Sequence, residues 1–200
     1  MAIKVGADRE IGWNPQLRLD RQKNYDIGNY ESTPFTFEAG NYNVYKNFNF
    51  SIFMTDYCNA DCKFCVAQLR YANKGLMYKK DKLDDKEWLK RCREVLEFIR
   101  PLNPSISITG GEPTLSKNLI PVLEMVKDLD FRKRTITTNG SQLFNKVGNK
   151  MIIDHLIDNG WNHLNVSRPA INNEQSKQIM RFNNEEGFCS NEMMKEIFRI

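Results

Sequence analysis

Four short apolar segments alternate with longer amphipathic segments over most of the chain. The apolar segments are residues 48–54, 105–109, 134–138 and 163–167, in which Ile, Phe, Val and Thr are frequent. Runs of this length and composition are typical of buried β-strands. Each run is followed by a loop and then by a segment with helical periodicity, so the pattern predicts an α/β fold.

The clearest helical periodicity lies between residues 83 and 99, just before Pro101, which cannot continue a helix. Its apolar stripe consists of Leu83, Trp88, Leu89, Cys92, Val95, Leu96 and Ile99. Because Cys92 lies on this stripe, it is predicted to be a core residue. The same spacing predicts further helices at residues 119–126, at 151–157, within 172–184, and after Ser190, which is a suitable N-cap.

The second, third and fourth predicted strands begin at residues 105, 134 and 163, an interval of 29 residues each time. A regular βα repeat indicates a parallel sheet with right-handed helical crossovers. A complete eight-unit barrel needs about 250 residues. The chain is therefore predicted to form a partial TIM-type (β/α) barrel with about four βα units. Two alternatives stay open for its last edge, a truncated barrel or an edge covered by another segment.

Residues 1–48 have a different character from the rest of the chain. They are polar, rich in asparagine and weakly periodic, which predicts an irregular N-terminal extension with a short hairpin within residues 35–48. Residues 49–200 are predicted to form the barrel domain.

Composition narrows the class of protein. The 29 basic and 25 acidic residues give a net charge of +4, too small to indicate nucleic acid binding. The sequence has no apolar run of about 18 residues and no signal-peptide pattern, so no membrane segment is expected. Five cysteines, three of them clustered, favour metal or redox chemistry in a reducing compartment, and we expect a cytoplasmic protein.

The carboxyl end of each predicted strand carries an unusual loop. The first strand leads into CNADCKFC at residues 58–65, and the second leads into TGGEP at residues 109–113. The third leads into TNG at residues 138–140, and the fourth leads into Ser167 and Arg168. Because the carboxyl ends of parallel strands meet at one rim, these four loops are predicted to form one site.

The three clustered cysteines, Cys58, Cys62 and Cys65, allow several interpretations. Their spacing also suits one face of a helix, although Asn59 and Asp61 favour a turn. A zinc ion would need a fourth ligand, for which the candidates are Cys189, His155 and His163. An iron–sulfur cluster normally takes four cysteines, so a cluster on three would keep one iron open to another ligand.

These motifs resemble those of a known family. CNADCKFC matches the CxxxCxΦC signature of radical S-adenosylmethionine (SAM) enzymes, with Phe64 at the aromatic position, and TGGEP is similar to the family's GGE motif. The resemblance covers about residues 48–182. TTNG and the pair Ser167-Arg168 also resemble the subgroup that contains molybdenum-cofactor biosynthesis enzymes and peptide-modifying maturases.

The resemblance implies a role for each motif. Cys58, Cys62 and Cys65 would bind a 4Fe–4S cluster whose fourth iron is chelated by SAM. The residues implied to contact SAM are Phe64, Gly110, Gly111, Glu112, Asn139, Ser167 and Arg168. A one-electron donor such as flavodoxin or ferredoxin would reduce the cluster, and reductive cleavage of SAM would give methionine and a 5′-deoxyadenosyl radical. That radical would abstract hydrogen from a peptide or a small metabolite.

Two other functions remain open at this level. One is a non-catalytic module that holds an iron–sulfur cluster or zinc without SAM, and the other is a truncated, inactive family member. His155 and His163 are expected to be structural. Cys189 is ambiguous, because it could be structural, could bind an auxiliary cluster or could donate a hydrogen atom.

Overall fold

The structure is a computed structural model that describes residues 32–37, 40–45, 48–65, 83–182 and 188–199. The chain divides into two compact units, residues 1–46 and 47–200. In the first unit, β1 (Ser32–Phe37) and β2 (Gly40–Tyr45) pair antiparallel. This pairing confirms the hairpin predicted within residues 35–48, although its first strand begins three residues earlier. Residues 1–31 of the predicted extension lie outside the described residues.

The second unit contains the predicted parallel sheet. Its strand order is β3 (Asn49–Phe53), β5 (Ser105–Thr109), β6 (Lys133–Thr138) and β9 (His163–Val166), and all three neighbouring pairs are parallel. Every predicted strand is present within one residue of its expected bounds at each end. The predicted α/β class with about four βα units is confirmed.

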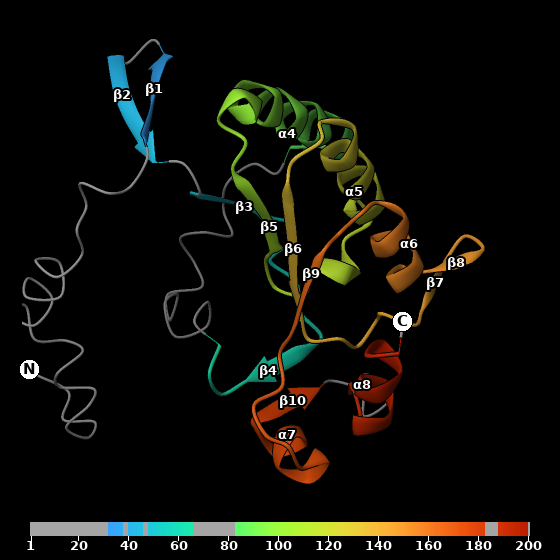
Figure 1. Cartoon of the computed structure of the whole chain (residues 1–200). Coiled ribbons are helices and arrows are strands. Elements are labelled where there is room, and N and C mark those ends of the chain that lie inside the picture. Colours follow the sequence, from blue (N-terminus) through green and yellow to red (C-terminus); the bar gives the residue numbers. More distant parts are fainter. Residues whose placement is uncertain (1–31, 38–39, 46–47, 66–82, 183–187, 200) are drawn as a thin grey trace, which may run out of the picture. The chain divides into compact units, whose positions relative to one another are not determined.

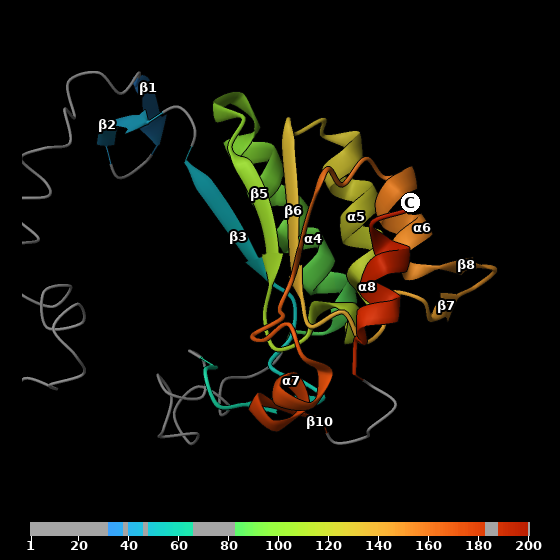
Figure 2. The same cartoon turned by 60° about the horizontal axis from the view of Figure 1, so that its bottom comes forward.

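Three helices cover one face of this sheet (Figures 1 and 2), namely α4 (Asp85–Ile99), α5 (Leu119–Asp128) and α6 (Ile152–Asp158). The Asp84 side chain accepts a hydrogen bond from the Glu87 N–H and caps the start of α4. Cys92 is half-buried and packs against the core, as predicted. Two single-turn 3₁₀ helices, η2 (Arg100–Leu102) and η3 (Pro113–Leu115), flank β5. Among the described helices, none is both long and apolar enough to cross a bilayer.

The two faces of the sheet have opposite character. Ile106, Ile108 and Ile136 are fully buried against the helices. Because successive side chains along a strand alternate between faces, Ser107 and Thr137 point to the other face, where they are only half-buried. The helix-covered face therefore holds the hydrophobic core, while the opposite face is polar and leads to the rim where the four loops meet.

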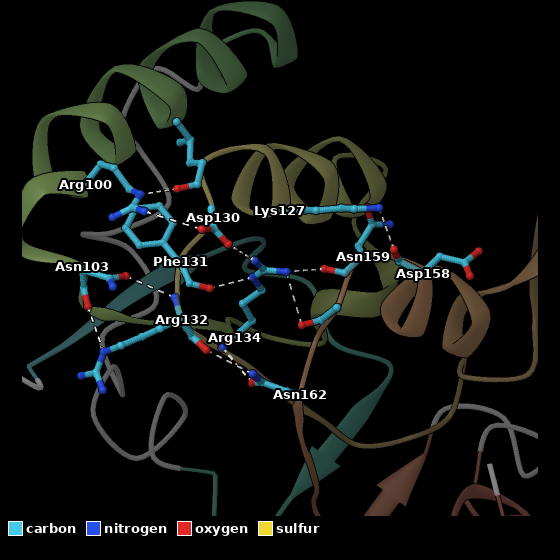
Figure 3. Close-up of polar contacts among 12 residues, drawn as sticks. Arg100, Asn103, Lys127, Asp130, Phe131, Arg132, Arg134, Asp158, Asn159 and Asn162 are labelled. Atoms are coloured by element: carbon cyan, nitrogen blue, oxygen red, sulfur yellow. Dashed lines mark hydrogen bonds and ion pairs between the residues drawn. The ribbon is translucent and has the colours of Figure 1, made fainter.

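An arginine joins the loops at the amino-terminal end of the sheet (Figure 3). The Arg134 guanidinium donates hydrogen bonds to the carbonyl oxygens of Phe131 (2.8 Å) and Asn159 (2.9 Å), and it lies 3.4 Å from an Asp130 carboxylate oxygen. Only 12% of the Arg134 side chain is exposed. Nearby, the Asn162 side chain accepts from the Arg134 N–H and donates to the Arg132 carbonyl. Arg134 therefore satisfies carbonyl groups at the start of β6 and at the end of α6.

We expect Arg134→Met to lower the free energy of unfolding by about 2–3 kcal/mol, because buried carbonyl groups lose charged donors. Urea unfolding monitored by circular dichroism measures this loss. Lys90→Met is the matched control, because the Lys90 ammonium pairs with Glu94 at 3.8 Å on an exposed helix surface, and it should change stability by less than about 0.5 kcal/mol. Equal losses in both variants would contradict the role given to Arg134.

Several short elements were not predicted from the sequence. β4 (Ala60–Cys62) pairs antiparallel with β10 (Met180–Phe182), and β7 (Lys146–Val147) forms a hairpin with β8 (Lys150–Met151). The helix predicted within residues 172–184 is α7 (Asn173–Ile179), which ends where β10 begins. The last helix is α8 (Asn191–Ile197), and the Ser190 side chain accepts from the Met193 N–H at its start, as expected of an N-cap.

Candidate functional site

The segment that carries the three cysteines, residues 54–65, is called the cysteine loop below. It continues directly from β3, and the Met54 N–H donates to the Thr109 carbonyl at the end of β5 (2.9 Å). Its middle residues form strand β4, and the Cys65 N–H then donates to the Cys62 carbonyl (3.0 Å). The alternative in which the cysteines form one face of a helix is therefore wrong, because Cys62 lies in a strand.

The GGE loop, residues 110–112, holds the start of the cysteine loop through its backbone. The Gly111 N–H donates to the Thr55 carbonyl (2.7 Å), and the Glu112 N–H donates to the Tyr57 carbonyl (2.8 Å). A Cβ atom on Gly111 would lie 2.1 Å from the Tyr57 carbonyl oxygen, and one on Gly110, whose φ is +146°, would lie 2.7 Å from the Thr55 oxygen. Both glycines are therefore required for the two loops to approach each other.

The Glu112 carboxylate is buried, with 1% of the residue exposed, and it joins the second and third strand ends. It accepts hydrogen bonds from the Thr138 hydroxyl (2.6 Å), from the Asn139 N–H (2.7 Å), and from both the N–H and the hydroxyl of Thr114. A buried carboxylate is stable only when such donors surround it. Glu112 thus fixes the end of β6 against the GGE loop.

Two asparagines join the third strand end to the cysteine loop. The Asn139 side chain donates to the side-chain oxygen Oδ1 of Asn59 (2.8 Å), and the Asn59 side chain donates to the Ser141 hydroxyl (3.0 Å). The side-chain nitrogen Nδ2 of Asn139 also lies 4.0 Å from the Cys58 sulfur. Since Asn59 follows Cys58 directly, these contacts hold the first cysteine beside β6.

The strand ends and the cysteine loop enclose a pocket of about 440 Å³. This volume falls within the range of about 300–1,000 Å³ that small-molecule sites occupy. The pocket is lined by Phe53, Cys58, Ala60, Cys62, Phe64, Cys65, Thr109, Gly110, Gly111, Glu112, Thr137, Thr138, Asn139, Ser167 and Met180. The structure therefore brings all three cysteines, the GGE loop, Phe64, Asn139 and Ser167 into one pocket.

Arg168 is not among the described residues that line this pocket. Its guanidinium donates to the Cys189 carbonyl and to the Asn173 side chain, both at 2.5 Å. The structure thus gives Arg168 partners other than those that the resemblance implied.

Burial in the pocket disfavours the thiolate forms of Cys58 and Cys62. Burial is the main cause that raises the pKa of Cys58. Burial, followed by repulsion from Cys58 and Cys65, raises the pKa of Cys62 to about 11. Three thiolates so close together need a positive charge to offset their repulsion, which suits a metal-containing group bound at all three.

Three thiols that line one pocket suit an iron–sulfur cluster, which proteins bind through several cysteines. In a cluster each cysteine binds a different iron, so the three sulfurs need not share one coordination sphere.

The three candidate fourth zinc ligands have other surroundings. His155 Nε2 lies 3.1 Å from the Val147 carbonyl, and His163 Nδ1 lies 2.9 Å from the Asn162 side-chain oxygen. Cys189 is buried where a Cβ atom on Gly140 would lie only 2.9 Å from its sulfur. None of the three is among the described residues of the pocket, which favours the structural interpretation of both histidines and of Cys189.

Sequence reasoning missed three contributors to this site. The sequence predicts a turn at Asn59 and a helix at Met180, and it gives no carboxylate partner for Thr138, yet all three contribute to the site. The TTNG motif contains Thr138 and so pointed to its position. No sequence signal indicates that Met180 pairs with Cys62 in the antiparallel pair of β10 and β4.

A sequence model of the family described as the Radical SAM superfamily matches residues 52–196. This chain belongs to the radical SAM superfamily. The match includes the cysteine loop, the GGE loop and the carboxyl ends of all four strands, so it confirms the resemblance on the residues that carried it.

Curated relatives share most of this radical SAM region. A probable GTP 3′,8-cyclase of Methanococcus maripaludis (strain C5) is 33% identical over 132 residues, which are 66% of this chain and 39% of the relative. A GTP 3′,8-cyclase of Rhizobium meliloti (strain 1021) is 30% identical over 133 residues, which are 64% of this chain and 34% of the relative. These relatives agree with the predicted subgroup. The chain spans less than two fifths of their length.

Solved structures are also similar to the radical SAM chain. SuiB of Streptococcus suis has 21% sequence identity and a TM-score of 0.49, and the similarity covers 70% of this chain and 28% of SuiB. SuiB bound to S-adenosylmethionine has 20% identity and a TM-score of 0.48, with the same coverage.

Proposed function

We propose that this chain is the catalytic core of a radical SAM enzyme, with a 4Fe–4S cluster on Cys58, Cys62 and Cys65 and SAM in the adjoining pocket. When bound, the reduced cluster and SAM supply a 5′-deoxyadenosyl radical, which removes a hydrogen atom from the substrate. The observation that carries the proposal is that the three cysteines and the GGE loop line one pocket, and that backbone hydrogen bonds join the GGE loop to the start of the cysteine loop.

The pocket residues have distinct parts in this proposal. Gly110 and Gly111 line the pocket beside the cysteine loop, and so does Glu112, whose carboxylate oxygen Oε2 accepts a hydrogen bond from the Asn139 N–H (2.7 Å). The SAM ammonium would be held at this loop, because an ammonium group needs oxygen acceptors. Phe64 is 45% exposed and offers an aromatic face for the adenine.

Asn139 and Ser167 are proposed to contact the ribose and the methionyl carboxylate, since both line the pocket. Ser167 is held there because its N–H donates to the Thr138 carbonyl (2.8 Å). We do not extend this role to Arg168, whose guanidinium is bonded to other parts of the chain.

The substrate is proposed to be a peptide or a small metabolite. The GTP 3′,8-cyclase relatives share the region proposed here to hold the cluster and SAM. This similarity supports a shared radical chemistry but does not identify the substrate. The electron donor is proposed to be a flavodoxin or a ferredoxin. A cytoplasmic location is proposed because three clustered thiols persist in a reducing compartment.

Anaerobic reconstitution with iron and sulfide tests the proposal. We expect about four irons and four sulfides per chain and, after SAM and dithionite are added, 5′-deoxyadenosine that mass spectrometry detects. Absence of 5′-deoxyadenosine from fully loaded protein would reject catalysis and favour an inactive family member. One zinc per chain in protein purified without added iron would favour a zinc module instead.

A further inference from the structure

The cysteine loop has a second support that is independent of the GGE loop. Strand β10 lies beside β4 (Figure 1) and pairs with it antiparallel, so that Met180 is opposite Cys62 and Phe182 is opposite Ala60. The Lys63 N–H also donates to the Ile179 carbonyl (3.1 Å). The second cysteine of the motif therefore lies inside a two-stranded ladder whose other strand comes from the carboxyl-terminal part of the chain.

β10 does not belong to the parallel sheet, so other contacts must hold it in place. The Phe182 ring meets the Phe188 ring edge-to-face, with centroids 5.9 Å apart and an interplanar angle of 79°. Phe188 is buried, with 7% of the residue exposed. An edge-to-face pair of this kind stabilises the packing of two segments beyond its buried area. The position of β10 thus depends on what holds Phe188.

Arg168 holds Phe188 and its neighbours. The guanidinium carbon lies 5.2 Å from the centroid of the Phe188 ring, within the range of a cation–π contact. The same group donates to the Cys189 carbonyl, to the Asn173 side chain at the start of α7, and to the Asn191 side chain at the start of α8. One planar cation therefore joins β9, α7 and α8 around one aromatic ring.

We propose that Arg168 is a positioning residue for the cysteine loop, acting through Phe188, Phe182 and the ladder between β10 and β4. The inference rests on the proposed cluster site, and it gives Arg168 a role different from the SAM contact that the family resemblance implied. Lysine cannot replace arginine here, because its ammonium is a point charge without the planar set of donors that reaches several acceptors and covers a ring at once.

Two variants of the full chain test this inference, Arg168→Lys and Phe182→Leu. Both should raise the hydrogen-exchange rates of backbone amides in residues 60–65 about tenfold or more in the protein without cluster, because the ladder opens more often. Both should also lower several-fold the iron retained after anaerobic gel filtration. The Kd of SAM for the fraction that keeps its cluster should stay within about twofold of the unsubstituted protein, since neither side chain is expected to contact SAM.

Lys177→Met is the matched control, because the Lys177 ammonium lies over the same Phe188 ring, at 5.7 Å, on an exposed side chain. It should leave exchange and iron retention near the values of the unsubstituted protein. The inference is overturned if Arg168→Lys raises the Kd of SAM while exchange and iron retention stay unchanged, or if Phe182→Leu has no effect on either. Failure of the unsubstituted protein to keep a cluster would reject the proposed function, and the exchange measurement would still decide whether Arg168 supports the loop.

Discussion

Replacing any one of Cys58, Cys62 or Cys65 with alanine is expected to lower 5′-deoxyadenosine formation more than about 100-fold. This loss exceeds the roughly 10- to 100-fold loss that follows when a residue that only hydrogen-bonds to a metal ligand is replaced. A cluster on three cysteines has no spare protein ligand, so each thiolate is needed. Cys189 is not placed to act as a substitute ligand, because it is buried and is not among the described residues that line the pocket. Iron content, the visible absorption of the cluster and product formation measure the effect together.

Cys92→Ala is the matched control for this series. Cys92 is half-buried on α4, and its pKa is raised to about 11 by burial, so it is an inert packing residue rather than a ligand. This variant should lose about 1 kcal/mol of stability at most and keep its cluster. The ligand assignment would be refuted if a variant of Cys58, Cys62 or Cys65 still formed product at the rate of Cys92→Ala.

The parallel sheet could be predicted because its signals are local. Each strand is a short apolar run bounded by loops, and the helix stripes need only the neighbouring turns to be recognised. The convergence of the four loops then followed from the geometry of parallel strands. The positions of Cys58, Gly111 and Asn139 in one pocket required no knowledge of side-chain contacts.

The ladder between β4 and β10 could not be predicted in this way. Each strand has three residues, too few for a periodic pattern, and the pairing joins segments far apart in the sequence. The partners of Glu112 and Arg168 raise the same difficulty, because a motif shows that a charged residue is present but not where its charge is directed. Glu112 bonds to Thr138 and Asn139 as well as facing the pocket, whereas Arg168 is directed toward Cys189 and Asn173.

Gly111→Ala is expected to prevent the cysteine loop from docking on the GGE loop. The added Cβ would lie 2.1 Å from the Tyr57 carbonyl oxygen, a backbone atom that cannot rotate away. Relief of this overlap requires the two loops to separate, which breaks the bonds from Gly111 to Thr55 and from Glu112 to Tyr57. We expect a loss of about 2–4 kcal/mol in stability and at least about a tenfold loss of cluster retention, because both overpacking and lost hydrogen bonds contribute.

Gly148→Ala separates this loop contact from the general cost of replacing glycine. Gly148 has a φ of +66°, so alanine is strained there by about 1–2 kcal/mol, but no described atom lies within 4 Å of the added Cβ. Both variants are therefore expected to lose stability, but Gly111→Ala alone should lose iron retention and affinity for SAM. If Gly111→Ala kept as much cluster as Gly148→Ala, the two glycines of the GGE loop would matter for SAM alone. Loss of the cluster only in Gly111→Ala would instead show that the GGE loop builds the cluster site by shaping the backbone of the cysteine loop.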